Sequence, residues 1–394
     1  MRPLMRMRAL AAAAAVAGTA ALAGLVRADD VQVPPLAIGE KAPDFDLPGV
    51  DGRRHALKEF APASLLVVVF TANHCPTAQA YEDRIQALEA DYRPKGVALV
   101  AISPNDPKAV RLDELGYTDL SDSLDEMVVR ARERGFKFPY LYDGETQAVS
   151  RLYGPQATPH VFVFDKARRL RFSGRIDDKE NPALAGTHET RDAIDALLAG
   201  RPVPIEKTKV FGCSIKWAEK RGWMVEGARR WAQEEVALLT ADEAALRDVV
   251  KNGSNKLRLV NAWATWCGPC VTEFPELITI NRMYRGRDFE VVTVSADAPE
   301  KREAALTFLK SQQASTRNLI FGTGDPYAMI ELVDPEWQGA LPYTMLVAPG
   351  GKVIYRSQGA FDPLRLKKAI VGWLGRYYHS KPGEMTATSR APSP

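Results

Sequence analysis

The sequence is poor in cysteine and carries little net charge. Only four of its 394 residues are cysteines, which excludes a small fold held together by several disulfides. A formal net charge of +3 excludes the large basic excess typical of proteins that bind nucleic acid. Hydrophobic residues make up 46% of the chain and charged residues 26%, as in globular rather than disordered proteins. The few cysteines can therefore be considered one by one.

Beyond the first residues, the sequence has no apolar run long enough to span a membrane. Residues 1–28 combine a basic start, an alanine-rich apolar run over 9–26 and the small residue Ala28. This pattern predicts a secretory signal peptide, with an uncleaved membrane anchor as the alternative. We expect export to the periplasm or another extracytoplasmic compartment, where a thiol is either locked in a disulfide or actively kept reduced.

Two stretches of the chain repeat one order of predicted elements. In each, a buried strand leads to a cysteine and a helix, a second strand and helix follow, and a proline then precedes two strands and a closing helix. The first stretch has predicted strands at 65–70, 97–102, 160–164 and 169–174, and helices at 81–92, 124–134 and 193–198. The second has predicted strands at 257–263, 289–294, 343–347 and 353–355, and helices at 240–250, 268–284 and 364–374.

Strands that alternate with helices predict two α/β domains, each with a central mixed sheet flanked by helices. We place the domains at 35–218 and 236–378, with a linker at 219–235. A Pro-, Ser- and Thr-rich tail at 379–394 is predicted to be disordered. Two motifs refine the second domain. Residues 240–243 have the pattern of a helix capping box that begins at Thr240, and Gly350 and Gly351 predict a hairpin turn.

The strongest chemical signal is the pair Cys267 and Cys270, separated by Gly-Pro at a predicted helix start. One helical turn places both sulfurs on the same side, at a separation compatible with a disulfide. The helix N-terminus favours the thiolate of Cys267, which would attack a substrate disulfide, and Cys270 would then resolve the mixed disulfide. A zinc site would need a further Cys/His pair that does not follow, and a purely structural disulfide closing so short a loop would stabilise little.

Residues 260–275 resemble the active-site region of thioredoxin-fold proteins of the TlpA/ResA type. These are extracytoplasmic thiol-disulfide oxidoreductases, usually reductants, and the resemblance extends over residues 236–378. It implies that Pro342 is a cis-proline facing the disulfide and that Leu341 contacts the substrate backbone. A proline that opens an apolar strand is also compatible with a simple edge or turn position.

The same resemblance points to further residues around the pair. Glu273 lies where ResA-type proteins have an active-site glutamate, and we hypothesise that it helps move the proton of Cys270. The alternative is a solvated glutamate that only favours the helix dipole. Asn261 stands where thioredoxin has a buried acid. Trp266 is expected to flank the disulfide as an apolar contact surface, and Trp263 is expected in the core.

The first stretch carries a single cysteine, Cys75, with no partner at Ala72 or Ala78, which excludes a CxxC mechanism there. The Cys-Pro-Thr at 75–77 and the Thr-Pro at 158–159 resemble the peroxiredoxin-like (AhpC/TSA, redoxin) group over residues 35–217. Residues 212–217 match a motif of its members and include Cys213. The resemblance implies a peroxidatic-like Cys75 and a substrate-side Pro159. Peroxiredoxins usually have a hydroxyl three residues before the cysteine, where this chain has Ala72.

Three interpretations of Cys75 stay open at this point. It is a peroxidatic nucleophile that Cys213 resolves, a partner of Cys213 in a stable disulfide, or a free thiol. His74 could stabilise a Cys75 thiolate, although adjacent side chains often point apart.

The predicted function is that of an exported thiol-disulfide oxidoreductase, possessing a redox-active disulfide and no other cofactor. Its expected partners are protein disulfides or thiols, a transmembrane thiol reductant and peroxide, with no nucleic acid and no metal. One hypothesis is an internal relay, in which Cys267 and Cys270 reduce an oxidised Cys75 or a Cys75–Cys213 disulfide. The alternative is a non-catalytic first domain that binds a partner such as an apocytochrome c or a metallochaperone. Gly-Pro between the cysteines is associated with reducing proteins, near about −270 mV in thioredoxin.

Overall fold

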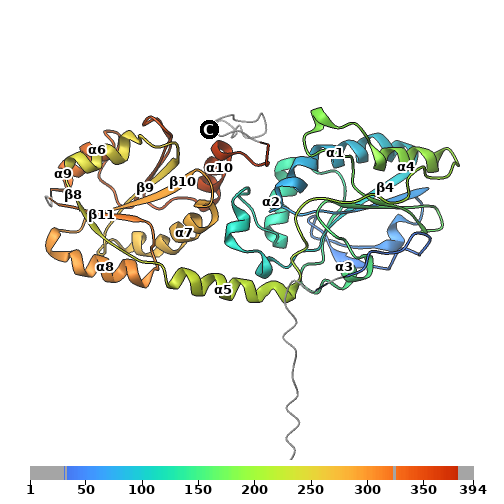
Figure 1. The fold of residues 1–394 in the computed structure, drawn as a ribbon, viewed down its shortest axis with the longest axis horizontal. Helices are drawn as coiled ribbons and strands as arrows, with labels where there is room; N and C mark the ends of the chain where they lie inside the picture. The colour runs from blue at the N-terminus through green and yellow to red at the C-terminus, as the bar shows by residue number, and fades with distance from the viewer. Residues whose placement is uncertain (1–30, 32, 323–324, 380–394) are drawn as a thin grey trace, which may run out of the picture.

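The computed structural model describes residues 31, 33–322 and 325–379. The predicted signal peptide at 1–28 and residues 380–394 of the predicted tail lie outside these. Two α/β units lie beside each other, and helix α5 (Arg221–Ala232) runs along one side from the first to the second (Figure 1). Within the described residues, no helix is both long and apolar enough to cross a bilayer.

The first unit is built on a five-stranded sheet in the order β5-β4-β3-β6-β7, in which β6 runs antiparallel to both of its neighbours, β3 and β7. Its strands are β3 (Leu65–Phe70), β4 (Val97–Ser103), β5 (Tyr140–Tyr142), β6 (His160–Phe164) and β7 (Leu170–Gly174). Its helices are α1 (Pro76–Tyr92), α2 (Leu124–Arg134), α3 (Ala148–Tyr153) and α4 (Glu189–Leu198). A short hairpin, β1 (Asp46–Pro48) and β2 (Arg54–Ala56), lies outside the sheet.

Strand β3 shows why this sequence forms a central strand. All six of its residues are apolar and buried. Successive side chains of a strand point to opposite faces, so β3 contributes to two cores. Leu65, Val67 and Val69 pack in the core with α1, α2 and α4. Leu66, Val68 and Phe70 pack in the core with α3 on the other face.

The second unit has a six-stranded sheet in the order β13-β12-β9-β10-β11-β8. Its strands are β8 (Leu239–Ala241), β9 (Leu257–Trp263), β10 (Phe289–Ser295), β11 (Arg317–Phe321), β12 (Tyr343–Val347) and β13 (Val353–Gln358). Its helices are α6 (Glu243–Lys251), α7 (Gly268–Tyr284), α8 (Arg302–Ser311), α9 (Pro326–Val333) and α10 (Pro363–Leu374). Helices α7, α8 and α10 pack on one face of this sheet, and α6 and α9 pack on the other.

The predicted fold class, two α/β units with mixed sheets between helices, is confirmed. The capping box predicted at Thr240 is wrong. Thr240 lies in strand β8, and Asp242 caps α6 by accepting a hydrogen bond from the backbone N–H of Ala245 at 2.8 Å. Gly350 and Gly351 have φ values of +83° and +89°, which suits the predicted turn between β12 and β13.

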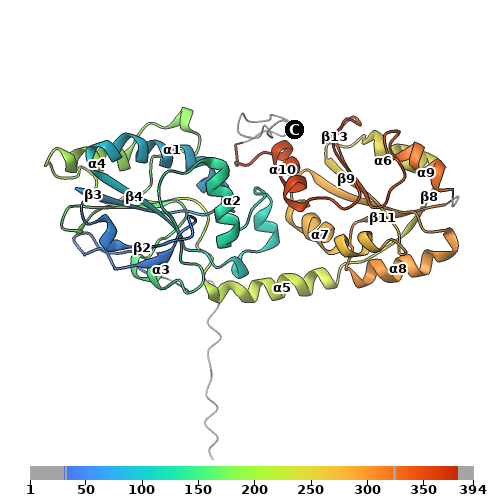
Figure 2. The same ribbon diagram turned by 180° about the vertical axis from the view of Figure 1, so that it is seen from behind.

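The two units are joined at the C-terminal end of α7. The Tyr284 hydroxyl donates to the Thr118 carbonyl oxygen at 2.7 Å, and Arg287 donates to the Gly116 carbonyl oxygen at 2.9 Å. A Cβ atom on Gly116 would lie 3.0 Å from the Met283 carbonyl oxygen, so the close approach favours glycine. The last described segment, which follows α10, also reaches the first unit (Figure 2).

Candidate active sites

The Cys267–Cys270 pair forms a disulfide at the N-terminus of α7, just after the central strand β9. The S–S distance is 2.05 Å and the Cα atoms are 5.3 Å apart. Cys267 is the N-cap of α7, and its Sγ accepts a hydrogen bond from the Cys270 backbone N–H at 3.3 Å. Cys267 is 6% exposed and Cys270 1%, so Cys267 is the more accessible sulfur. This backbone N–H at the helix N-terminus donates to the Cys267 sulfur, which favours the thiolate form of Cys267 after reduction.

The two tryptophans before the disulfide have different surroundings. Trp266 is 69% exposed, so a large apolar surface lies next to Cys267. Trp263 is fully buried and packs against Phe274 with ring centroids 5.0 Å apart. An exposed tryptophan beside a reactive sulfur is the kind of surface that binds an apolar segment of a partner protein.

The Leu341–Pro342 peptide bond is cis. It directly precedes strand β12, which pairs with β9, and Leu341 packs against the hydrophobic cluster that contains both Cys267 and Cys270. The structure therefore brings the predicted proline loop to the same end of the sheet as the disulfide.

Glu273 is held by two hydrogen bonds on the first turns of α7. Its Oε1 accepts from Asn261 Nδ2 at 3.2 Å, and its Oε2 accepts from the Phe361 backbone N–H at 3.1 Å. Burial raises the pKa of Glu273 to about 7, against the lowering effect of both hydrogen bonds. A carboxyl group that titrates near neutral pH, one helical turn from Cys270, is suited to exchange a proton there.

The site around Cys75 repeats this plan in the first unit. Strand β3 leads to Cys75, which is the N-cap of α1 and accepts a hydrogen bond from the Ala78 backbone N–H at 3.4 Å. Its thiol donates to the Thr158 carbonyl oxygen at 3.3 Å, and the Thr158–Pro159 peptide bond is cis. Cys75 is fully buried and packs against Ala72 and Ala78.

Cys213 is brought to Cys75 by a backbone bridge. The Thr158 backbone N–H donates to the Cys213 carbonyl oxygen at 3.0 Å, and the Cys213 side chain packs on the Cys75 cluster. Both cysteines are free thiols in this structure. The arrangement joins the two residues that the sequence paired by resemblance.

A buried charge network that the sequence did not predict surrounds His74. His74 Nδ1 lies 2.5 Å from the Asp122 carboxylate, which also accepts from Asn105 Nδ2 at 2.8 Å. Burial lowers the pKa of His74, but the Asp122 charge outweighs it and the pKa is raised. Asp122 comes from the segment before α2, so only the folded chain reveals it.

The pKa values of the two thiols are shifted in opposite directions. Burial raises the pKa of Cys75, but a hydrogen bond from Cys213, the charge of His74 and the Ala78 N–H outweigh it and bring the pKa to about 6. The hydrogen bond with Cys75, together with burial, raises the pKa of Cys213. The two groups are coupled, and the shifts favour the thiolate on Cys75 and the thiol on Cys213.

His160, next to the cis-proline Pro159, has no such charge. Its Nδ1 accepts from the Gln156 backbone N–H at 3.1 Å, and its Nε2 lies 3.0 Å from the Ser173 hydroxyl. Burial lowers its pKa to about 3, so it is neutral at physiological pH and has a structural role.

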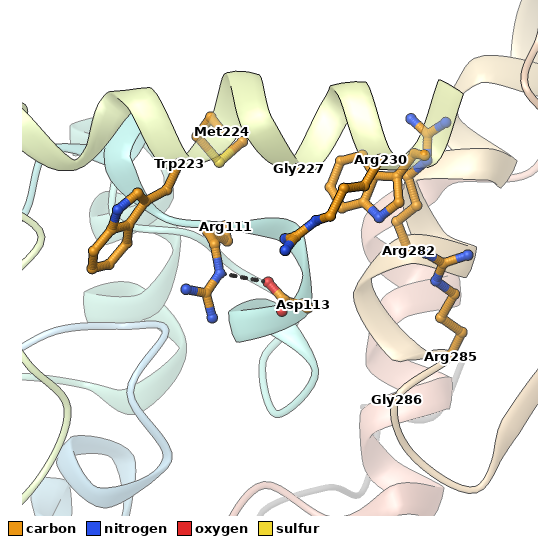
Figure 3. A pocket seen from close by; sticks show the side chains of 10 residues that line it. Arg111, Asp113, Trp223, Met224, Gly227, Arg230, Arg282, Arg285 and Gly286 are labelled. Carbon is orange, nitrogen blue, oxygen red and sulfur yellow. Dashed lines mark hydrogen bonds and ion pairs between the residues drawn. The ribbon is translucent and has the colours of Figure 1, made fainter. Parts of the chain in front are cut away.

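A cavity of about 210 Å³ lies where α5 meets both units (Figure 3). It is lined by arginines from the linker helix and from both units. Arg111 is paired with Asp113, while Arg282 donates to Gln313 and lies over the Trp231 ring. None of the four cysteines belongs to the described lining of this cavity.

Comparisons with known proteins agree with the two-part architecture. Residues 38–173 match the AhpC/TSA family, and residues 242–370 match the Redoxin family. The chain is 29% identical to the thiol:disulfide interchange protein CycY of Rhizobium leguminosarum over 145 residues, which are 35% of this chain and 68% of CycY. It is 30% identical to the thiol-disulfide oxidoreductase ResA of Bacillus subtilis over 98 residues, which are 24% of this chain and 49% of ResA.

The match to ResA thus spans about half the length of that relative. Among solved structures, an uncharacterized conserved protein from Geobacillus kaustophilus is 38% identical, with a TM-score of 0.41, and the match covers 46% of this chain and 92% of that one. The predicted resemblance to both families is confirmed. The chain consists of an AhpC/TSA-family domain followed by a Redoxin-family domain, both with the thioredoxin fold.

Proposed function

We propose that the second domain is a thiol-disulfide oxidoreductase that reduces protein disulfides outside the cytoplasm. The observation that carries this proposal is the Cys267–Cys270 disulfide at the N-terminus of α7, with Trp266 exposed beside it. Relatives named thiol-disulfide oxidoreductase or thiol:disulfide interchange protein support the same chemistry.

In the reduced enzyme, the Cys267 thiolate attacks one sulfur of a substrate disulfide. A bond forms between Cys267 and that sulfur, the substrate S–S bond breaks, and the other substrate sulfur leaves as a thiolate. Cys270 then loses its proton and attacks Cys267 Sγ. This forms the disulfide seen here and releases the second substrate sulfur as a thiol, so two electrons pass from the enzyme to the substrate.

Glu273 is proposed to accept the proton of Cys270 in the second step. Its carboxylate predominates above its pKa of about 7, and Asn261 and Phe361 hold it in one orientation. Pro342 and Leu341, immediately before the strand β12 that pairs with β9, are proposed to bind the substrate backbone beside the disulfide.

The direction of transfer is tested by the reduction potential of the Cys267–Cys270 pair, measured by equilibration with glutathione or dithiothreitol buffers. A potential near about −270 mV, as in thioredoxin, supports a reductant that a membrane dithiol recharges. A potential near about −120 mV, as in DsbA, would contradict the reducing role.

For the first domain, we propose a thiol peroxidase site made of Cys75 and Cys213. The supporting observation is that Cys75, a buried free thiol at the N-terminus of α1, packs against the free thiol of Cys213. The lowered pKa of Cys75 agrees with this role. Cys75 would attack a hydroperoxide, taking one oxygen to become a sulfenic acid and releasing an alcohol or water. Cys213 would then form a disulfide with Cys75 and release water. A dithiol must reduce that disulfide.

The test is exposure of the reduced chain to one equivalent of hydrogen peroxide. Dimedone trapping of a Cys75 sulfenic acid, followed by a Cys75–Cys213 disulfide, would support the peroxidase. A disulfide between these residues in protein taken directly from cells, with no reaction towards peroxide, would support the alternative of a partner-binding domain. The candidate partners of such a domain remain an apocytochrome c or a metallochaperone.

The internal relay is not favoured by this arrangement of the domains. Thr118 connects the two sites, since its hydroxyl donates to the Asn73 carbonyl oxygen near Cys75 while its own carbonyl oxygen accepts from Tyr284. Tyr284 is the last residue of α7 and Cys267 is its N-cap, and the 17 residues of the helix span about 25 Å. The two cysteine sites therefore lie toward opposite ends of α7. We propose that exchange between them occurs between two molecules or after the domains separate.

A further inference from the structure

The cavity between α5 and the two domains is not used by the redox chemistry proposed above. It has a volume of about 210 Å³, and its described lining contains none of the cysteines. One face of α5 lines it, because Trp223, Gly227, Arg230 and Trp231 recur at helical spacing (Figure 3). Side chains of the first domain and of the C-terminal end of α7 complete the lining, so three parts of the chain meet around one space.

Arginine is the most frequent residue of this lining. Four arginines contribute to it, and they come from α5 and from both domains. The one carboxylate in the described lining, Asp113, is paired with Arg111 at 3.0 Å. Arg285 is paired at 2.7 Å with Glu234, which lies outside the described lining. The other two arginines, Arg230 and Arg282, have a different environment.

Arg282 has no ion pair within the described residues. Its side chain donates to the neutral amide oxygen of Gln313 at 3.0 Å and lies over the Trp231 ring. Burial and the charge of Arg285 lower the pKa of Arg282, against a smaller opposite effect of Glu234. The charge of Arg282 is therefore left without a close counter-charge.

Arg230 is the second arginine without a counter-charge. Among the residues that the structure describes, its guanidinium has no hydrogen-bond or ion-pair partner. Figure 3 shows the side chain extending from α5 across the cavity. Together with Arg282 it lines one small cavity, where an anion would supply the negative charge that the lining lacks.

The two tryptophans of α5 hold arginines of different domains in place. The guanidinium carbon of Arg111 lies 5.7 Å from the Trp223 ring centroid, and that of Arg282 lies 4.7 Å from the Trp231 ring centroid. Stacking uses the face of a guanidinium group and leaves the N–H groups at its edge available as donors. A stacked guanidinium is thus oriented before a ligand arrives, and its N–H groups suit the oxygens of an oxyanion.

We propose that this cavity binds a small oxyanion with two or more negative charges, of the phosphate or pyrophosphate type. Drug-sized ligands usually occupy pockets of about 300–1,000 Å³, so a cavity of about 210 Å³ suits a smaller ligand. Arg230 and Arg282 donate to its oxygens, and the bound anion connects the linker helix with the second domain. This binding is independent of the reactions of the cysteines.

Binding is measured by isothermal titration calorimetry of the full chain with pyrophosphate at constant ionic strength. Potassium chloride is titrated as the reference for nonspecific charge effects. The parent chain should bind one pyrophosphate per molecule, and chloride should give no saturable heat. The absence of saturable binding at millimolar pyrophosphate would overturn the proposal.

Arg230→Gln and Arg282→Gln should each weaken binding about tenfold, because each removes a charge-assisted hydrogen bond. Arg229→Gln is the matched control. It makes the same change of charge on α5, but Arg229 lies outside the described lining and is paired with Glu226 at 3.8 Å. The Kd of this variant should stay within about twofold of the parent value. Equal weakening in all three variants would overturn the proposal, because the anion would then respond only to the general charge of α5.

Gly227→Leu tests the cavity itself without a change of charge. A Cβ atom at this position would lie 3.7 Å from the Trp231 ring, an ordinary contact, so a side chain can enter the space. Leucine also favours a helix more than glycine does, so α5 should be retained. The variant should bind pyrophosphate at least about tenfold more weakly, with the circular dichroism spectrum and the Cys267–Cys270 reduction potential of the parent. Unchanged binding would mean that the anion lies elsewhere on the protein, and would overturn the proposal.

Discussion

Asn261 donates a hydrogen bond from the central strand β9 to the carboxylate of Glu273 on α7, at 3.2 Å. The same amide donates to the Thr344 hydroxyl on β12 at 3.0 Å. Asn261 thus connects strands β9 and β12 with helix α7 next to the disulfide. An amide cannot exchange a proton, whereas the carboxyl group it holds titrates near pH 7. Proton transfer at this site therefore depends on Glu273.

We expect Glu273→Gln to change the pH dependence of disulfide reduction. The wild-type rate should rise through pH 7, since only the carboxylate can accept the Cys270 proton. The variant should lose this step and be about tenfold slower above pH 7. Glu276→Gln, on the next turn of the same helix, is the matched control. Stopped-flow reduction of a small disulfide by the reduced enzyme would measure this, and identical profiles would contradict the proton-transfer role.

The same substitution should also affect stability, with a defined sign. The pKa of the Glu273 carboxyl group is raised in the folded state, from 4.5 to about 7, so folding favours its neutral form. Its contribution is most favourable below pH 4.5 and is lost as the pH rises through 7. The free energy of unfolding of Glu273→Gln, relative to that of the wild type, should therefore increase as the pH is raised from 5 to 8. The increase should be on the order of 2 kcal/mol. Chemical denaturation at both pH values would measure the difference, and a constant difference would exclude a raised pKa.

The two cysteines of the second domain should behave differently when replaced. Cys270→Ser leaves the nucleophile Cys267 and should accumulate a mixed disulfide with a substrate, because nothing resolves it. Cys267→Ser removes the accessible sulfur and should neither trap nor reduce the substrate. Non-reducing electrophoresis and intact mass after incubation with a disulfide-bonded protein would show the adduct. An equal amount of adduct with Cys267→Ser would reverse the assignment of the two roles.

Asp122→Asn should raise the pKa of Cys75. The Asp122 charge holds the pKa of His74 up, and the charge of His74 helps to hold that of Cys75 down. We expect the thiolate absorbance at 240 nm to appear about one pH unit higher or more, and the reaction with peroxide at pH 7 to slow accordingly. Asp83→Asn, at an exposed acid on α1, is the control and should leave the titration unchanged. A titration in Asp122→Asn identical to wild type would mean that the His74 charge does not act on Cys75.

The domain junction can be tested through its buried ion pair. Arg376→Gln leaves Asp119 buried without its cation, which should cost about 3 kcal/mol of stability and loosen the contact between the domains. Lys368→Gln removes a more exposed pair with Glu133 and should cost less than about 1 kcal/mol. Thermal unfolding would compare the two variants, and small-angle scattering would report the domain arrangement. Equal small effects would show that the Arg376 pair does not hold the junction.

Much of the fold follows from local patterns in the sequence. The apolar run Leu65–Phe70 is a strand with the predicted bounds, because the strand is buried on both faces and reads as a continuous apolar segment. Short or solvent-facing elements such as β5, α8 and α9 lack that signal and were not predicted. The N-cap of α6 was wrongly predicted because Thr240 and Asp242 are both good N-cap residues. Thr240 instead lies in β8, which pairs with β11, and this leaves Asp242 as the N-cap.

The two candidate active sites also differ in how much of each could be predicted from the sequence. The Cys267–Cys270 motif is local, so its geometry could be predicted from spacing alone. The environment of Cys75 could not, because Asp122 reaches the neighbouring His74 from a distant part of the chain. For His74, the sequence left open whether its side chain faces its neighbour, and the contact with Asp122 fixes its position.

The position of one cysteine pair in each domain has a consequence for electron storage. Each pair can hold two electrons as a dithiol, so one chain would carry four reducing equivalents. Because α7 keeps the two pairs apart, they would act as two separate redox couples. If the two couples differ in reduction potential, a stepwise titration with a reductant should then show two waves. The wave of the Cys267–Cys270 couple should be unchanged when Cys75 and Cys213 are both replaced by serine.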